Sequence, residues 1–153
     1  MWTPMLECHF PLPPMVAVPG LPGVKQSTSI AKDGNCLFRA VSQHVYATQD
    51  MHMTARAKAV EWLQGRPHLV ATYTVEGAGH LGANTWLTEM AKMGTWGDEL
   101  AILGLAEAYG ESLWVYSDQH GLHSTYPGGA SGPYLGLIHL GANHYEILSL
   151  SCD

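Results

Sequence analysis

The chain has 153 residues, of which 46% are hydrophobic and only 13% are charged, and its net charge is −6. This hydrophobic content is enough to bury the core of one domain, which excludes a wholly disordered chain. The negative net charge argues against a protein that follows nucleic-acid phosphates with clustered Lys and Arg. No apolar run in the sequence approaches the roughly 20 residues of a membrane-spanning helix. We therefore expect one domain that binds neither nucleic acid nor membranes.

The cysteines and histidines do not form a metal or disulfide pattern. The three cysteines, Cys8, Cys36 and Cys152, are odd in number and have no C-x-x-C spacing. The histidines between His52 and His139 lack the i, i+4 spacing of a zinc-binding helix. We expect no metal and no other cofactor, and a reducing compartment such as the cytoplasm.

Prolines mark the N-terminal segment, since six of the nine lie within the first 22 residues. This composition predicts that residues 1–29 form an extended arm, either packed on the domain or the end of a linker. Residues 27–30 have the pattern of a short strand, and Lys-Asp-Gly-Asn at 32–35 is typical of a turn. Residues 30–153 are predicted to form the domain.

Helical patterns come next along the chain, and strand patterns dominate its last third. A stripe with helical spacing follows the turn, at Leu37, Ala40, Val41, His44 and Val45. Further helices are predicted at residues 53–64, 84–93 and 98–109. Strands are predicted at residues 113–117, 123–126, 134–140 and 145–150. This order indicates an α+β fold in which helices pack on a small, largely antiparallel sheet.

Cys36 lies at the start of the first helix, directly after the glycine turn. The free N–H groups and the positive end of the helix dipole favour a thiolate there, and the same amides can bind an oxyanion. We therefore expect a lowered thiol pKa and faster alkylation than at the other cysteines. Gly34 is expected to take a positive φ and bring its amides close to a substrate. The alternative is a buried, inert cysteine that opens an ordinary amphipathic helix.

His144 begins the last predicted strand and can serve as the base that a thiol nucleophile needs. Residues two apart on a strand share a face, so Glu146 can orient the ring by accepting its Nδ1–H. Asn143 and Asp33 are competing acceptors, although Asn143 faces the other side of a strand. A cysteine near the N-terminus followed by a late histidine is the order of papain-like enzymes. The alternative is that His144 is an ordinary surface or core histidine.

Three segments resemble the sequence boxes of the ovarian-tumour (OTU) family of cysteine proteases. Asp-Gly-Asn-Cys-Leu-Phe-Arg-Ala at residues 33–40 resembles the nucleophile box. Gly-Thr-Trp-Gly-Asp-Glu-Leu at 94–100 is similar to the central Gly-x-Trp-Gly-x-x-Glu-Leu stretch, one residue shorter before the glutamate. Asn-His-Tyr-Glu at 143–146 resembles the histidine box, with glutamate where the family usually has Asp or Asn. The boxes occur in the family's order and span nearly the whole chain after the arm.

The resemblance implies an OTU fold without a metal, with Cys36 as nucleophile, His144 as base, and Glu146 or Asp33 as the third catalytic residue. It places the oxyanion hole at Asp33, Gly34, Asn35 and Cys36. It also implies that a channel for the substrate's terminal Gly-Gly is lined by Trp96, Gly97, Asn143 and Tyr145.

By this resemblance the protein is a deubiquitinase that cuts after the last glycine of ubiquitin or a ubiquitin-like modifier on ubiquitinated proteins. One alternative is a viral protease of the same fold that processes a polyprotein and acts in the host cytoplasm. Another is an inactive module that only binds ubiquitin, against which the presence of both Cys36 and His144 argues.

Overall fold

The computed structural model describes two residues of the first strand and most of the chain from the second strand onward, apart from several loops. Its backbone is described for residues 16–17, 24–74, 82–117, 121–126, 134–141 and 144–150. Side chains are described for residues 29–74, 82–117, 125–126, 135–141 and 144–148. Cys8, Cys152 and Asn143 lie outside these ranges. None of the helices in the described ranges has the length and apolar content of a bilayer-spanning segment.

Helices occupy the first part of the described chain and strands occupy the last part. The helical elements are α2 (Cys36–Tyr46), the 3₁₀ turn η1 (Gln49–Met51), α3 (His52–Gln64), α4 (Pro67–Tyr73), α5 (Ala83–Met90) and α6 (Glu99–Tyr109). The strands are β1 (Val16–Ala17), β2 (Val24–Thr28), β3 (Ser112–Ser117), β4 (Gly121–Tyr126), β5 (Tyr134–Leu140) and β6 (His144–Leu150).

The strands form one mixed sheet in the order β1-β2-β6-β5-β3-β4. Only β3 and β5 pair in parallel, and every other neighbouring pair is antiparallel. The α+β class and the largely antiparallel sheet are therefore confirmed. Strands β1 and β2 belong to the segment predicted as an arm, and β2 pairs with β6, with Gln26 opposite Leu148.

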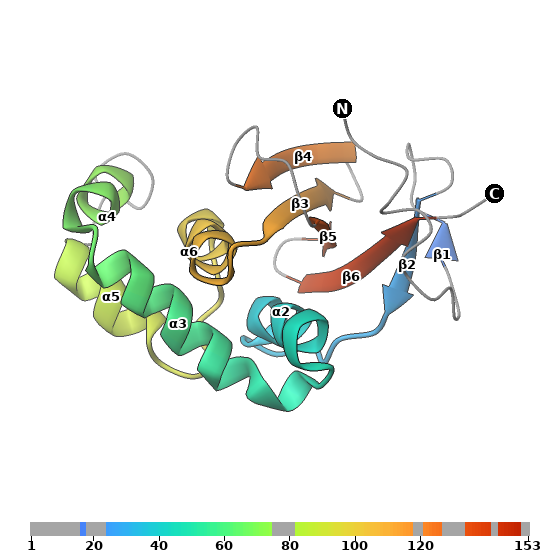
Figure 1. Cartoon of the computed structure of the whole chain (residues 1–153), viewed down its shortest axis with the longest axis horizontal. Helices are drawn as coiled ribbons and strands as arrows, with labels where there is room; N and C mark the ends of the chain where they lie inside the picture. Colours follow the sequence, from blue (N-terminus) through green and yellow to red (C-terminus); the bar gives the residue numbers. More distant parts are fainter. Residues whose placement is uncertain are drawn as a thin grey trace.

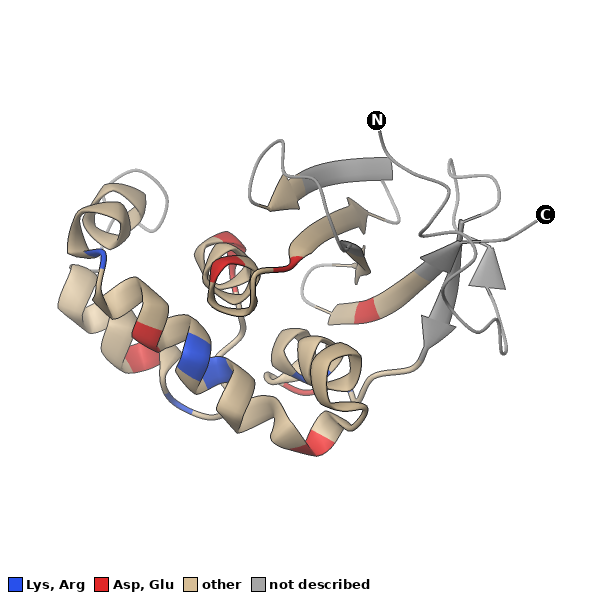
Figure 2. Cartoon of the chain, in the orientation of Figure 1, with Lys and Arg blue, Asp and Glu red and all other residues tan. Residues whose placement is uncertain are grey.

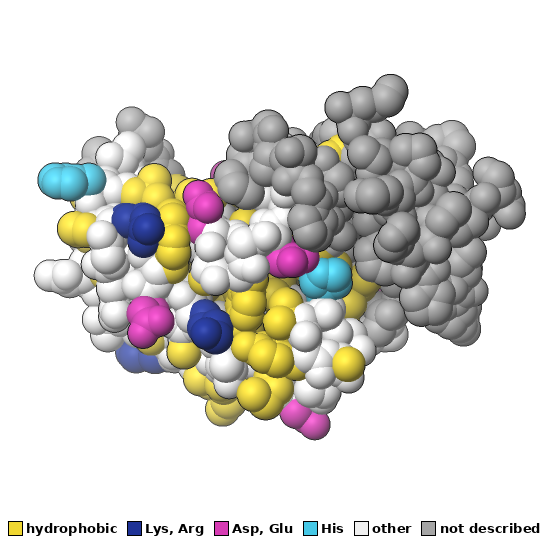
Figure 3. Space-filling model, viewed as in Figure 1, with side chains coloured by type: hydrophobic (Ala, Val, Ile, Leu, Met, Phe, Trp, Pro, Cys, Tyr) yellow, Lys and Arg dark blue, Asp and Glu magenta, His cyan; other side chains and the backbone are white. Residues whose placement is uncertain are grey.

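The helices lie on one side of the sheet, with α2 and α6 nearest to it and α3, α4 and α5 farther out (Figure 1). The core between these layers is built from the apolar stripes of α2, α3 and α6 and the inward faces of β3, β5 and β6. Charged side chains are few and are scattered over several elements (Figure 2). Hydrophobic side chains also reach the surface in a band over α2 and α3 (Figure 3).

Most predicted elements are present within one or two residues of their predicted ends, and the differences have local causes. Helix α4 is not among the helices predicted from the sequence. Proline is well suited to the first turn of a helix, where its missing N–H is not needed, and here Pro67 begins α4. Helix α5 begins one residue before Asn84 and ends at Met90 rather than Met93.

The loop between α5 and α6 is fixed at its far end by Asp98. The Asp98 carboxylate accepts the Ala101 N–H at 3.0 Å and so caps α6. Its other oxygen accepts the indole N–H of Trp86, on α5, at 2.9 Å. This loop carries Gly94 and Trp96, and the two bonds of Asp98 tie it to both flanking helices.

Candidate active site

Asp33 holds the turn that leads into helix α2. One carboxylate oxygen accepts the Asn35 N–H at 2.9 Å, and the other lies 3.0 Å from Nη2 of Arg39 in an ion pair. Burial raises the pKa of Asp33, but the hydrogen bonds from Arg39 and from the Asn35 amide outweigh it, so that the pKa lies below 3.8. The Asp33 carboxylate thus joins its own turn, at Asn35, to the first turns of α2, at Arg39.

Gly34 is required here by space rather than by backbone conformation. The positive φ expected at Gly34 is wrong, because among the described glycines only Gly94, Gly110 and Gly141 have one. A Cβ built on Gly34 would lie 1.8 Å from the carbonyl oxygen of Gly94, which no side chain can tolerate. The turn before Cys36 is therefore in direct backbone contact with the loop between α5 and α6.

Cys36 is the first residue of α2 and is only 1% exposed. Its sulfur accepts backbone N–H groups of Tyr145, on β6, and of Leu37. Burial nevertheless raises the pKa of the thiol, and the nearby carboxylate of Asp33 adds to the rise. The predicted lowering of the thiol pKa is thus wrong for this state of the protein, because desolvation outweighs the amides at the helix start.

His144 and Glu146 form a buried pair at the start of β6. Nε2 of His144 lies 2.8 Å from Oε2 of Glu146, and their side chains are 12% and 6% exposed. The same Glu146 oxygen accepts the Ile30 N–H at 3.3 Å. The pairing of these two residues follows the prediction, but it uses Nε2 and not the expected Nδ1. A carboxylate accepts hydrogen bonds, so in the neutral ring the proton is on Nε2 and Nδ1 is left with its lone pair.

Nδ1 of His144 is buried and has no hydrogen-bond partner in the described part of the chain. The thiol of Cys36 accepts the N–H of Tyr145, the residue that follows His144, so the thiol lies against the start of β6. Two residues 108 positions apart in the sequence are brought together in this way, because α2 packs on β6. A buried ring nitrogen with an available lone pair, on the strand whose amide contacts a buried thiol, suits the chemistry of a nucleophile and its base.

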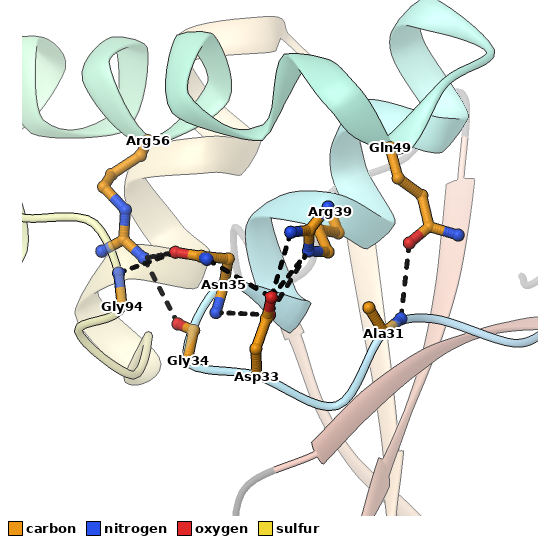
Figure 4. A network of polar contacts seen from close by, with 8 residues as sticks. All are labelled: Ala31, Asp33, Gly34, Asn35, Arg39, Gln49, Arg56 and Gly94. Carbon is orange, nitrogen blue, oxygen red and sulfur yellow. Dashed lines mark hydrogen bonds and ion pairs between the residues drawn. The ribbon is translucent and has the colours of Figure 1, made fainter.

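Asn35, in the turn before Cys36, forms a polar cluster with Arg56, a residue that was not predicted from the sequence (Figure 4). The side-chain oxygen of Asn35 accepts the Gly94 N–H at 2.8 Å and Nη2 of Arg56 at 2.9 Å. Arg56 is completely buried, although it lies on α3. It falls on the buried stripe of Ala59, Val60 and Leu63, at the intervals i+3, i+4 and i+7. A single arginine on an otherwise apolar helical stripe is the sequence pattern that predicts this buried position.

A family model described as OTU-like cysteine protease matches residues 31–134, more than half of the chain. The chain belongs to the OTU-like cysteine protease family. The matched range contains the boxes at residues 33–40 and 94–100, and the histidine box at 143–146 follows it.

Relatives of this OTU domain include one protein named as a deubiquitinating enzyme and one named as an OTU domain-containing protein. The chain is 34% identical over 77 residues to "OVARIAN TUMOR DOMAIN-containing deubiquitinating enzyme 10" of Arabidopsis thaliana, covering 50% of this chain and 20% of that protein. It is 29% identical over 96 residues to human "OTU domain-containing protein 5", covering 63% of this chain and 16% of that protein. The chain therefore spans about a fifth or less of the length of these relatives.

Solved structures show the same fold in cellular and viral proteins. The OTU domain of OTUD1 has 23% identity and a TM-score of 0.66, over 82% of this chain and 85% of that one. An OTU domain in complex with ubiquitin has 17% identity and a TM-score of 0.67, over 88% of this chain and 75% of that one. The viral OTU domain protease from Dera Ghazi Khan virus has 18% identity and a TM-score of 0.64, over 86% and 92%.

The residues expected along the substrate channel occupy two different environments in the OTU domain. Trp96 is 44% exposed on the loop that contacts Gly34. Gly97 packs closely against Leu37 of α2, since a Cβ on Gly97 would lie 2.4 Å from Cδ2 of that residue. The ring of Tyr145 is buried and stacks on His139, with centroids 4.6 Å apart, so it supports β6 and does not present a surface.

Three of the four amides expected in the oxyanion hole already donate within the turn. The Asp33 N–H donates to the Ala31 carbonyl and the Cys36 N–H to the Asp33 carbonyl, both at 3.1 Å. The Asn35 N–H donates to the Asp33 carboxylate. In the described part of the chain, the Gly34 N–H has no acceptor.

The described residues also contain no group of three or more His, Cys, Asp or Glu side chains arranged to hold a metal ion.

Proposed function

We propose that this OTU domain is a cysteine protease that hydrolyses the peptide or isopeptide bond after the C-terminal glycine of ubiquitin or a ubiquitin-like modifier. The observation that carries this proposal is the buried Nδ1 atom of the His144 ring. Its Nε2 is bound by Glu146, while its Nδ1 has no partner among the described residues and lies on the strand whose amide contacts the Cys36 thiol. Glu146 is accordingly the orienting residue of the proposed triad, and Asp33 holds the turn.

The proposed reaction begins with transfer of the thiol proton from Cys36 to Nδ1 of His144. The raised pKa of the buried thiol means that ionisation is coupled to this transfer, because an imidazolium beside the sulfur stabilises the thiolate. The sulfur attacks the carbonyl carbon of the substrate's last glycine, and the resulting oxyanion is met by the amides of residues 33–36. The Gly34 N–H is proposed as the main donor, because the other amides are engaged.

His144 then gives its proton to the leaving amine, which departs and leaves a thioester on Cys36. Water, deprotonated by the same nitrogen, attacks the thioester carbonyl and releases the new carboxyl end and the thiol. Trp96 and Gly97 are proposed to line the channel for the terminal glycines, since only small residues pass between closely packed loops. A thiol nucleophile must stay reduced, which favours the cytoplasm, or the host cytoplasm for a viral protein.

Ubiquitin is the proposed partner because similar proteins carry that function in their names. The Arabidopsis relative is named a deubiquitinating enzyme, and one structure with this fold is an OTU domain in complex with ubiquitin. The viral protease with this fold is less than 25% identical to this chain. That likeness concerns the fold alone and gives no support to a polyprotein as the substrate.

The deciding experiment uses ubiquitin with an electrophile in place of its C-terminal carboxylate. The wild-type protein should gain the mass of one ubiquitin, while Cys36→Ala should gain none and remain folded by circular dichroism. In a fluorogenic ubiquitin assay, Cys36→Ala and His144→Ala should each lose at least ~10³-fold in kcat, because nucleophile and base act as a unit. Reversible binding of ubiquitin without capture would indicate an inactive binding module. The absence of both binding and capture would refute ubiquitin as the substrate.

A further inference from the structure

Arg56 links three parts of the molecule behind the nucleophile (Figure 4). Its Nη2 donates to the side-chain oxygen of Asn35 at 2.9 Å and to the Gly34 carbonyl at 3.3 Å. Its Nη1 donates to the Met90 carbonyl, at the end of α5, at 2.9 Å. The guanidinium also lies over the Phe38 ring, 4.1 Å from its centroid. One side chain of α3 therefore fixes the turn before Cys36 to the end of α5.

The charge of Arg56 is buried without a carboxylate beside it. Arg56 is 0% exposed and forms no ion pair with any Asp or Glu in the described ranges. Burial lowers its pKa to about 10, so the guanidinium is still a cation at neutral pH. An isolated buried charge costs free energy that an apolar residue would not, and here it is offset by carbonyl and amide oxygens and by an aromatic face. Packing alone does not require such a residue on this stripe.

We propose that Arg56 is a positioning residue for the nucleophile, which holds the Gly34–Asn35 peptide in place and sets a fixed positive charge behind Cys36. The proposal rests on the proposed function only as far as turnover is concerned, since its effect on the thiol can be measured without a substrate.

The planar guanidinium holds its N–H donors in a fork of fixed directions, and this fork explains why arginine and not lysine occupies this position. The Asn35 oxygen accepts from Arg56 and from the Gly94 N–H, so it connects the nucleophile turn to the loop that carries Trp96. A planar group with donors in fixed directions can hold Met90 on one side and the turn on the other, whereas an ammonium is a point charge. Arg56 therefore sets the position of the turn relative to the loop on which the proposed channel is built.

The proposed effect of the Arg56 charge on Cys36 adds to that of the other groups that face the thiol. Asp33, on the same turn, raises the thiol pKa, and the buried phenol of Tyr145 interacts with the thiol from β6. His144 starts the same strand, and its imidazolium would favour the thiolate. The cations on the helix side include Arg39, which is paired with Asp33, and Arg56, which is bonded to the Gly34 carbonyl two residues before Cys36. Removal of Arg56 leaves Asp33 paired with Arg39 and takes away the positive charge bound to the Gly34–Asn35 peptide.

The test measures the rate of Cys36 alkylation by iodoacetamide from pH 6 to 10, by mass spectrometry of the peptide that contains it. Wild type is compared with Arg56→Met, which removes charge and fork, and with Arg56→Lys, which keeps only the charge. Leu63→Ala serves as the matched control, because Leu63 is fully buried on the same helix and packs toward α6, away from the turn. Melting temperatures and ubiquitin turnover are measured for all four proteins.

We expect Arg56→Met to raise the pH midpoint of alkylation by about 0.5 to 1 unit, as for loss of a nearby opposite charge. Its kcat should fall by about 100-fold with KM changed less than about threefold, because a misplaced catalytic group lowers turnover and not binding. Arg56→Lys should keep the midpoint and lose about tenfold in kcat. Leu63→Ala should lower the melting temperature and leave the midpoint unchanged.

The proposal would be overturned if folded Arg56→Met had the same pH midpoint of Cys36 alkylation as the wild type. It would also be overturned if Leu63→Ala shifted this midpoint by as much as Arg56→Met does. If Arg56→Met does not fold, Arg56→Lys decides, and wild-type kcat in that variant would show that the fork is not needed. A wild-type protein that alkylates normally but never turns over ubiquitin would refute the proposed substrate and leave the midpoint comparison valid.

Discussion

The two halves of the candidate site are held in place by different means. The nucleophile turn has no regular backbone ladder, and side chains from three directions fix it: Arg39 from α2, Arg56 from α3, and Asn35 toward Gly94. His144 lies on a strand whose register with β5 is fixed by backbone pairing, and one carboxylate, Glu146, orients its ring. An irregular segment must satisfy its backbone groups with side chains, whereas a strand satisfies them with its neighbours.

This difference separates the effects expected of substitutions. A change in the nucleophile turn should lower stability and activity together, because the contacts that place Cys36 also join α2, α3 and α5. A change at Glu146 should act mainly on turnover, because the sheet keeps the strand in place.

Gly34→Ala should have the largest effect of the variants below. Its Cβ would lie 1.8 Å from the Gly94 carbonyl oxygen, so the turn and the α5–α6 loop must move apart. We expect a loss of about 3 kcal/mol or more in unfolding free energy, at the upper end for overpacking, and about a 1,000-fold loss of ubiquitin turnover. Gly65→Ala is the control, since Gly65 has a φ of −76° and its Cβ would meet only an atom at 3.6 Å. Equal stability of the two variants in urea titrations would contradict the tight contact.

Glu146→Ala should lower kcat by about ten- to a thousandfold with KM nearly unchanged, because the thiol–imidazole pair loses its orienting acceptor. The unfolding free energy should fall by only about 1–3 kcal/mol, the cost of leaving the buried ring nitrogen unpaired. Glu146→Gln keeps an acceptor oxygen and should lie between wild type and alanine. Steady-state kinetics with fluorogenic ubiquitin measure this. A wild-type rate in Glu146→Ala together with a crippled Asp33→Ala would move the orienting role to Asp33.

Trp96→Ala should weaken turnover without much effect on stability, because 44% of Trp96 is exposed. We expect kcat/KM for ubiquitin substrates to fall by about tenfold, or about 1.4 kcal/mol, if Trp96 forms a wall of the proposed channel. Trp86→Ala is the matched control, because Trp86 is 2% exposed and its removal should cost about 3–5 kcal/mol. Thermal unfolding and kinetics of both variants decide. A drop in melting temperature as large as that of Trp86→Ala would make Trp96 a packing residue.

The smallest expected effect is the acid dependence of the turn. The pKa of Asp33 lies below 3.8 in the folded protein, so its contribution to stability is present above 3.8 and is lost as the pH falls through the folded-state value. Asp33→Asn lacks this contribution at every pH. The difference in urea midpoint between wild type and Asp33→Asn should therefore be greatest at pH 6–7 and shrink below about pH 4. A difference that stays constant down to pH 3 would show that the ion pair with Arg39 contributes nothing.

Features that depend on neighbours in sequence were predictable without the structure. The stripe of α2, the ends of α6 to within one residue, and the runs that became β3, β5 and β6 all follow from local spacing. The resemblance of residues 33–40 and 94–100 to OTU boxes led to the family, which the comparisons confirm. The pairing of His144 with Glu146 was also predictable, because it follows from strand alternation.

Features that depend on contacts between distant residues were decided only by the tertiary structure. The reason for glycine at position 34 is the backbone of Gly94, and the burial of Arg56 arises because Asn35 and Met90 approach it from other elements. The direction of the Cys36 pKa shift was mispredicted for the same reason. The helix start that favours a thiolate is visible in the sequence, whereas the desolvation that outweighs it comes from packing α2 against β6.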